Sequence, residues 1–156
     1  MNTISTTLTR TSARPPDVVY PALIHCDAVR VFRPIGALPG VVSVQLHNDR
    51  WGHQGDTRTI TLTDGSTAHE ALTAVVAPDS FTYTVSAYTS VLRLLVSRGE
   101  STFTCSPTTS GGTLITWTYA YTPRSVLVRP LVWLVRVLLW ERYMTAAFDR
   151  ALSDIS

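Results

Sequence analysis

The chain has 156 residues, of which 45% are hydrophobic and 15% are charged, and all thirteen basic residues are arginine. The absence of lysine excludes Schiff-base catalysis, a P-loop lysine and a Ser-x-x-Lys acylation centre. The net charge is only +2, and the arginines are spread from Arg10 to Arg150. This pattern argues against nucleic-acid binding. The length predicts a single domain over residues 1–156.

Cysteine spacing and hydrophobic segments indicate the cellular setting. Cys26 and Cys105 match neither a CxxC nor a zinc-ligand spacing, which indicates free thiols in a reducing compartment. The N-terminus lacks the apolar core of a secretory signal, so we expect a cytoplasmic protein. The apolar run 126–140 has fifteen residues, including Arg129 and Arg136, whereas a transmembrane helix needs about 20. We therefore expect no transmembrane span. The run is then a helix on a membrane surface, a dimer face or a core helix.

Turn signals and hydrophobic periodicity predict helices near both ends of the chain and strands between them. Proline and acid residues favour a helix start at Pro15-Pro16-Asp17. From Asp56 onward, apolar and polar side chains alternate with period two. The predicted elements, in chain order, are a strand at 3–9, a helix from 15, a short helix at 27–32, strands at 41–46, 57–63, 67–76, 81–86, 102–106 and 113–121, and a helix at 130–152. Consecutive hairpins imply an antiparallel sheet with one threonine-rich face and one apolar face that the last helix covers.

Several motifs give the chain a family resemblance over about Pro15 to Leu152. They are Pro39-Gly40-Val41-Val42, Gly55-x-x-Arg58-x-Ile60, Asp64-Gly65 followed by Glu70-x-Leu72, Phe81-x-Tyr83, and Gly112-Thr113-x-x-x-Trp117 before the closing amphipathic helix. In these features the sequence resembles the START-like SRPBCC superfamily, which includes a polyketide cyclase/dehydratase and lipid-transport group.

The resemblance implies an α+β helix-grip fold. In this fold a curved antiparallel sheet wraps around a long C-terminal helix, two short helices lie near the N-terminus, and an apolar cavity lies between sheet and helix. Members bind hydrophobic small molecules, and some catalyse cyclisation or dehydration without a cofactor. We therefore expect neither a cofactor nor a metal. Because one fold hosts many functions, the activity has to be argued from the residues of the site.

Arg58 and Glu70 lie on the apolar faces of their predicted strands. A charge on such a face is costly unless it is paired, so we expect the two side chains to meet each other or a ligand. A three-residue loop at 64–66 would make them diagonal neighbours, whereas a two-residue loop would shift the register by one and separate them. The pair is then either a buried structural ion pair or a catalytic pair in which Arg58 orients an oxygen and Glu70 moves a proton.

The last helix has two predicted faces when residues are placed at 100° intervals. The inward side of its C-terminal half carries Tyr143, Met144, Ala147, Phe148 and Ala151, and the same stripe continues back through Trp140, Arg136, Trp133 and Arg129. An exposed outer patch of Leu131, Leu134, Val135 and Leu138 would then contact a second copy, an acyl carrier protein or a membrane. Alternatively the helix rolls, these leucines face the sheet and Arg136 reaches solvent.

The remaining candidate residues are aromatic or titratable side chains expected around the cavity. Tyr88 and Arg93 would lie at its mouth, with 91–96 as a gate, and His53 would be a general base at its edge. The spacing of the four histidines does not support a metal site. The predicted catalytic residues are Arg58, Glu70, His53 and Tyr83, and the predicted ligand-binding residues are Trp51, Tyr88, Arg93, Trp117, Tyr119, Tyr121, Trp133, Arg136, Trp140 and Met144.

These residues lead to one functional hypothesis and two alternatives. The leading hypothesis is a cofactor-free cyclase or dehydratase of polyketide-type natural-product biosynthesis, in which arginines stabilise an enolate and Glu70, a tyrosine or His53 moves protons. The first alternative is a non-catalytic binding or transport protein for a lipid or polyketide. The second is a structural partner protein that uses the outer leucine patch.

Overall fold

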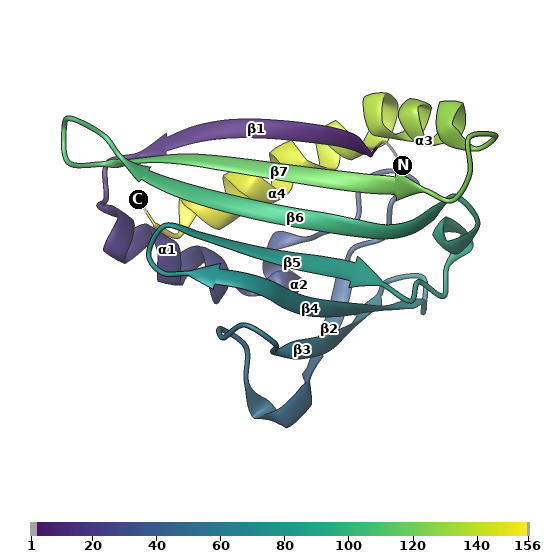
Figure 1. Cartoon of the computed structure of the whole chain (residues 1–156), viewed down its shortest axis with the longest axis horizontal. Coiled ribbons are helices and arrows are strands. Elements are labelled where there is room, and N and C mark those ends of the chain that lie inside the picture. The colour runs from purple at the N-terminus through teal and green to yellow at the C-terminus, as the bar shows by residue number, and fades with distance from the viewer. Residues whose placement is uncertain (1–2, 156) are drawn as a thin grey trace.

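The computed structural model describes residues 3–155, which form one antiparallel sheet and a set of helices on its concave face (Figure 1). The seven strands are arranged in the order β1-β7-β6-β5-β4-β3-β2. Their bounds are β1 Ile4–Ser12, β2 Val41–Leu46, β3 Thr57–Leu62, β4 Thr67–Val76, β5 Ser80–Ser86, β6 Val96–Pro107 and β7 Thr113–Pro123. The curved sheet and long helix confirm the predicted helix-grip fold.

Two short helices connect β1 to β2, and one long helical segment closes the chain. Helix α1 (Pro16–Ile24) begins at the predicted prolines, and α2 (Ala28–Val31) is capped by Asp27, whose carboxylate accepts hydrogen bonds from two backbone N–H groups. The closing segment consists of α3 (Arg129–Val135), a π-helical turn (Arg136–Trp140) and α4 (Glu141–Ser153). Figure 1 shows α4 crossing behind β6 and β7, with α3 at the upper right near the start of β1.

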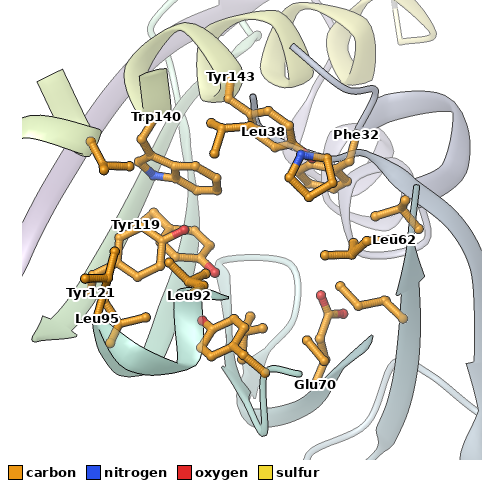
Figure 2. Close-up of a pocket in the computed structure, with 18 of the residues that line it drawn as sticks. Phe32, Leu38, Leu62, Glu70, Leu92, Leu95, Tyr119, Tyr121, Trp140 and Tyr143 are labelled. Carbon is orange, nitrogen blue, oxygen red and sulfur yellow. The ribbon is translucent and has the colours of Figure 1, made fainter. Parts of the chain in front are cut away.

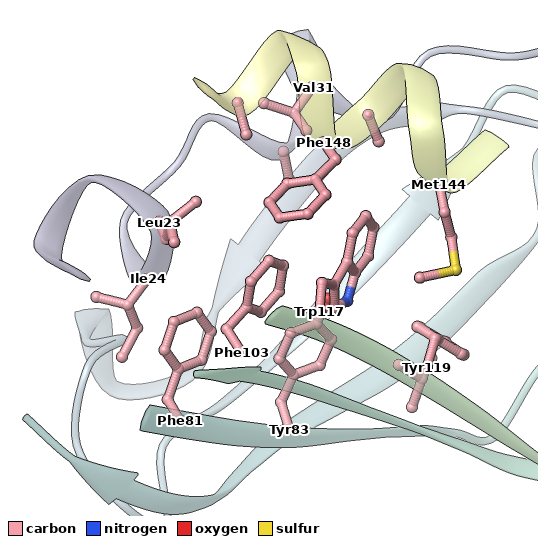
Figure 3. Close-up of a cluster of buried hydrophobic side chains, with 14 of the residues drawn as sticks. Leu23, Ile24, Val31, Phe81, Tyr83, Phe103, Trp117, Tyr119, Met144 and Phe148 are labelled. Atoms are coloured by element: carbon pink, nitrogen blue, oxygen red, sulfur yellow. The ribbon is translucent and has the colours of Figure 1, made fainter. Parts of the chain in front are cut away.

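An aromatic cluster fills the space between the sheet and α4 (Figure 3). Phe81, Phe103 and Trp117 stand directly opposite one another on β5, β6 and β7, and their rings stack at centroid distances of 5.0 and 4.9 Å. Phe148 of α4 meets Trp117 edge-on at 5.6 Å. The Trp117 indole N–H donates a hydrogen bond to the buried Ser101 hydroxyl. This cluster forms the solid core and leaves the far end of the sheet for a cavity.

The π-helical turn corrects the predicted inner face of the last helix. The predicted inward residues of α4 are all buried, but Val132 is buried instead of Trp133, whose exposed fraction is 53%. The Glu141 N–H donates to the carbonyl of Arg136, five residues earlier, so this turn contains one extra residue. The extra residue rotates α3 relative to α4 by one residue position, about 100°. Val135 therefore turns inward, while Leu131, Leu134 and Leu138 stay exposed as predicted.

Three further strand predictions need correction. Strand β6 begins at Val96, not at 102, so part of the predicted gate is strand. The period-two alternation predicted from Asp56 onward breaks at a bulge between Leu72 and Ala74, so the end of β4 changes face and Val76 is exposed. In the β3–β4 hairpin, the Leu62 N–H donates to the Ser66 carbonyl, so the loop consists of residues 63–65. Arg58 and Glu70 are consequently directly opposite each other and not diagonal.

Among residues 3–155, no helix combines the length and the apolar character that crossing a bilayer requires.

Candidate functional site

A cavity of about 130 Å³ lies between the sheet and the last helix, beyond the aromatic cluster. Its walls come from four parts of the chain: the inner faces of β2 to β7, α2 with the loop that follows it, the segment after β5, and the helix from Val132 to Tyr143 (Figure 2). Most of the lining is aliphatic or aromatic, which suits a hydrophobic ligand.

Glu70 carries the one carboxylate among the described residues that line this cavity. Its side chain is 8% exposed and accepts a hydrogen bond from Arg58 Nε at 2.5 Å. The Arg58 guanidinium in turn lies 3.8 Å from the Trp51 ring centroid. Neither Arg58 nor Trp51 lines the cavity, so they hold Glu70 from behind while its carboxylate faces the ligand space (Figure 2).

Five tyrosines, Tyr83, Tyr88, Tyr119, Tyr121 and Tyr143, surround the same space. Burial raises the pKa of Tyr119 and of Tyr121 well above the ordinary value, and neighbouring tyrosine hydroxyls raise both further. Burial likewise raises the pKa of Tyr88, and the Glu70 carboxylate adds to that rise. All these hydroxyls therefore stay protonated at neutral pH, and they can donate hydrogen bonds to an oxygen of a ligand.

Trp140 contributes a hydrogen-bond donor that the protein itself does not use. Its ring packs edge-on against Tyr119 and Tyr121 at 4.7 and 5.2 Å and stacks on Tyr143 at 5.1 Å. Its indole Nε1 is buried and has no hydrogen-bond partner among residues 3–155. The hydroxyl of Tyr88, close to that of Tyr119, also lacks a hydrogen bond of standard geometry there. A buried N–H without a partner is costly, so an acceptor from a ligand would be favoured here.

Arg136 reaches the edge of the cavity, but its guanidinium is already engaged. Its Nε donates to the Ser5 carbonyl at 2.8 Å and to the Thr6 hydroxyl at 3.1 Å, and its Nη2 lies 3.1 Å from Glu141. These contacts tie the π-helical turn to β1. The predicted setting between two indoles is wrong, because Trp133 points away from the cavity.

The structure brings half of the predicted site residues to the cavity. Those lining it are Glu70, Tyr83, Tyr88, Tyr119, Tyr121, Arg136 and Trp140. Arg58, Trp51, Trp117 and Met144 lie in the core beside it and do not line it. His53, Arg93 and Trp133 lie on the surface, away from Glu70.

Local contacts explain the surface positions of His53 and Arg93. The His53 side chain is 74% exposed, and its ring lies 3.6 Å from Asp56, to which its backbone N–H also donates. These contacts form a turn on the outside of the molecule. The Arg93 guanidinium donates to the carbonyls of Thr89 and Ser90, so it caps its own loop and stays out of the cavity.

Sequence reasoning placed the segment 91–96 at the cavity but missed the wall between α2 and β2. Phe32, Leu38 and Pro39 line the cavity from the segment between α2 and β2, and Leu92 and Leu95 line it from the segment after β5. Phe32 was assigned to the predicted short helix at 27–32, and Pro39 entered only through the family motif. The signal in this segment was its unusually apolar loop composition. In the structure Phe32 also stacks on Tyr143 at a centroid distance of 6.2 Å.

The histidines, cysteines and acids do not converge on a metal site. No group of three such side chains that could hold a metal ion occurs in residues 3–155. Burial, together with the nearby Asp79 carboxylate, raises the pKa of Cys105 to about 11. This thiol is thus protonated at neutral pH and is a poor metal ligand.

Comparison with solved structures supports the fold. The crystal structure of Ara h 8.0201 is similar with a TM-score of 0.69 and 15% identity, covering 99% of this chain and 98% of the other. Ginseng major latex-like protein 151 from Panax ginseng has a TM-score of 0.69 and 16% identity, covering 99% of this chain and 98% of the other. A protein of Nitrosospira multiformis has a TM-score of 0.69 and 11% identity, covering 98% of this chain and 97% of the other. At this identity the likeness shows the fold alone. A search of curated protein sequences found no match.

A family model tests the resemblance over almost the whole chain. The model described as "Polyketide cyclase / dehydrase and lipid transport" matches residues 3–155, and it is of the SRPBCC type. The predicted START-like SRPBCC membership is thereby confirmed, and family and fold together suggest the binding of a hydrophobic ligand. With its helix-grip sheet and its apolar cavity around Glu70, the chain belongs to the polyketide cyclase / dehydrase and lipid transport family.

Proposed function

We propose that the cavity binds a small, ring-bearing, oxygenated hydrophobic molecule and that Glu70 acts on it as a general base in cyclisation or dehydration. The observation that carries this proposal is the placement of Glu70, a carboxylate in an otherwise apolar lining with its counter-ion Arg58 behind it. A base that is exposed to the ligand and shielded from water is suited to proton abstraction next to a carbonyl.

The volume of the cavity limits the size of the ligand. An apolar cavity of about 150 Å³ in another protein holds one benzene molecule, and the present cavity measures about 130 Å³. The conformation described here therefore accommodates a single ring or a short acyl chain. A larger polyketide would require an outward displacement of Leu92 and Leu95.

The polar groups specify the chemistry of the ligand. Glu70 and Trp140 face the cavity from opposite sides (Figure 2). An ionised carboxylate only accepts hydrogen bonds and an indole N–H only donates. The preferred ligand therefore presents an acidic C–H or a donor to Glu70, and its acceptor oxygen reaches the covered Trp140 N–H once the side chains over it shift.

A dehydration can be written with these groups. Glu70 removes a proton from the carbon beside a ligand carbonyl, and the electron pair moves to the carbonyl oxygen. The Tyr88 hydroxyl, whose pKa is raised by burial and by the Glu70 carboxylate, donates a hydrogen bond to that carbonyl oxygen. The enolate then expels a β-hydroxyl, which takes the proton from Glu70 and leaves as water. In a cyclisation, the enolate carbon instead bonds to a second carbonyl of the same ligand, whose oxygen takes the proton.

Arg58 acts as a positioning residue in this scheme. Its hydrogen bond and its stacking on Trp51 fix the carboxylate of Glu70, but its own guanidinium does not reach the ligand space. The alternative function, a non-catalytic carrier, is favoured by this same contact, because a carboxylate already paired with arginine needs no ligand to complete it.

Native mass spectrometry of the purified protein, followed by identification of any bound molecule, supplies the substrate for the decisive test. If Glu70 is the base, Glu70→Gln lowers turnover of that molecule by about 100-fold or more. Gln keeps an oxygen that accepts from Arg58, so binding of the molecule persists. If the wild-type protein binds the molecule and releases it unchanged, the protein is a carrier and not a catalyst.

A control variant separates chemistry from stability. Phe103→Leu weakens the aromatic cluster, away from the residues that line the cavity. It should lower the melting temperature at least as much as Glu70→Gln does and leave turnover close to that of the wild type. Equal losses of turnover in the two variants would point to a purely structural Arg58–Glu70 pair.

A further inference from the structure

Large apolar side chains are exposed at one end of the molecule. The most exposed are Leu127 at 87%, Val126 at 74% and Val91 at 71%. We call this surface the apolar tip. It consists of Val91 and Leu94 in the 3-10 helix η2 (Val91–Leu94), Val126 and Leu127 in the loop from β7 to α3, and Leu131, Trp133, Leu134 and Leu138 on the outer side of the last helix.

Hydrogen bonds join the two loops of the apolar tip. The backbone N–H of Arg124 donates to the Leu95 carbonyl at 2.8 Å, and its Nε donates to the Arg93 carbonyl at 2.7 Å. In Figure 1 the loop leading to α3 and the short helix between β5 and β6 lie at the same end of the sheet. The exposed residues of both loops therefore form one surface, with α3 continuing it.

The charges around the apolar tip are strongly one-sided. Residues 91–98 and 124–142 together carry six arginines and one acid, Glu141. The rest of the chain carries seven arginines and ten acids. A net charge of +5 is thus gathered at the end that carries the apolar tip, while the remainder has a net charge of −3. Arg93, Arg98, Arg124 and Arg142 are exposed there.

From this combination we infer that the apolar tip docks on an anionic lipid surface. Protruding aliphatic residues and an exposed tryptophan enter the headgroup region of a bilayer, and the arginines beside them bind lipid phosphates. A second copy of the chain is a poorer occupant, because a symmetric contact would bring two +5 surfaces together.

The same segments also form a wall of the cavity. Leu92 of η2 and Leu95 directly after it line the cavity, and Val132 and Val135 line it from α3. Docking would therefore place this wall against the bilayer. A hydrophobic molecule could pass between membrane and cavity by displacement of these four side chains, without crossing water.

Vesicle binding tests the inference. Purified protein is mixed with vesicles of phosphatidylcholine alone or of phosphatidylcholine with phosphatidylglycerol, and the bound fraction is measured by sedimentation. We expect binding to the anionic vesicles, at least a tenfold loss of affinity with Val126→Glu, and weakening by added salt. Val76→Glu is the matched control, because Val76 is also an exposed valine but lies outside the apolar tip, and the variant should bind like the wild type.

Tryptophan fluorescence gives a second readout. Trp133 is exposed while Trp51 and Trp117 are buried, so insertion should shift the emission to shorter wavelength through Trp133. The shift should disappear in Trp133→Phe. Absence of binding to anionic vesicles would overturn the inference. So would equal loss of binding in Val76→Glu and Val126→Glu, or a dimer that Val126→Glu dissociates. Binding only to an acidic acyl carrier protein would likewise overturn it.

Discussion

Arg58 and Glu70 are directly opposite on β3 and β4 and share a hydrogen bond of 2.5 Å, with the Trp51 ring stacked on the guanidinium. Both side chains are almost fully buried. Arg58→Met should lower the free energy of unfolding by about 3–5 kcal/mol, because the Glu70 carboxylate is left buried without a counter-ion. Chemical denaturation measures this loss.

The double variant Arg58→Met/Glu70→Leu completes the cycle. Replacement of both charges by apolar groups removes the unpaired ion, so most of the lost stability should return. If the two single losses simply added in the double variant, the two residues would not be energetically coupled.

Trp140→Phe tests the unused indole N–H. The variant keeps a ring against Tyr119 and Tyr143 but removes a buried donor that has no partner in the described part of the chain. Stability should be retained or increased. Binding of 4-hydroxyacetophenone, a single ring with an acceptor and a donor, should weaken by about tenfold, since one hydrogen bond contributes about 1 kcal/mol or more in an apolar site. Isothermal titration checks both probes, with ethylbenzene as the control whose affinity should not change.

Gly99 is required by the position of Tyr119. A Cβ at residue 99 would lie 2.7 Å from both Cε1 and Oη of the Tyr119 ring. Gly99→Ala should therefore destabilise the protein by about 1–3 kcal/mol through overpacking. Tyr119→Leu should restore part of this loss in the double variant. Unchanged thermal unfolding of Gly99→Ala would show that the ring moves freely into the cavity.

Asp56 links stability to acid pH. Burial raises its pKa, but hydrogen bonds from the His53 N–H and the Arg50 guanidinium lower it more, and the net pKa is below the ordinary value. Its contribution to stability is therefore present above pH about 4 and is lost as the pH falls through the folded-state pKa. Thermal unfolding between pH 7 and pH 2.5 should show Asp56→Asn clearly less stable than the wild type at neutral pH. The difference should shrink in acid, and a constant difference would contradict this assignment.

The sequence was sufficient for the parts of the fold that depend on local periodicity. The alternation along 57–85 and 113–121 placed Tyr83, Tyr119 and Tyr121 on the inner face, and the same pattern identified Glu70 as a charge in an apolar setting. The register of the β3–β4 hairpin was harder to predict. The same sequence is compatible with a loop at 63–65 and with one at 64–66, and the two differ only in their backbone hydrogen bonds.

The site residues that were misplaced depend on non-local geometry. Trp133 was assigned inward because a regular α-helix was assumed, and no residue between Arg136 and Trp140 signals an extra residue in the turn. His53 and Arg93 were placed by proximity in sequence to cavity segments, but their own loops hold them at the surface. Phe32 and Leu38 reach the cavity through tertiary packing that periodicity does not encode.

The π-helical turn has a further consequence for how this chain tolerates change. Because one extra residue sets the angular phase between α3 and α4, the packing of Phe148 and Met144 in the core does not dictate which side of α3 faces outward. Deletion of a single residue such as Val137 would remove the bulge and leave a regular helix with Val132 and Val135 still facing the cavity. If the undeleted chain instead formed a regular helix, α3 would rotate by about 100°, and Trp133 would enter the cavity in place of Val132. A single-codon deletion in this turn should thus preserve the lining of the cavity and the outer surface, while loss of the bulge alone would exchange both.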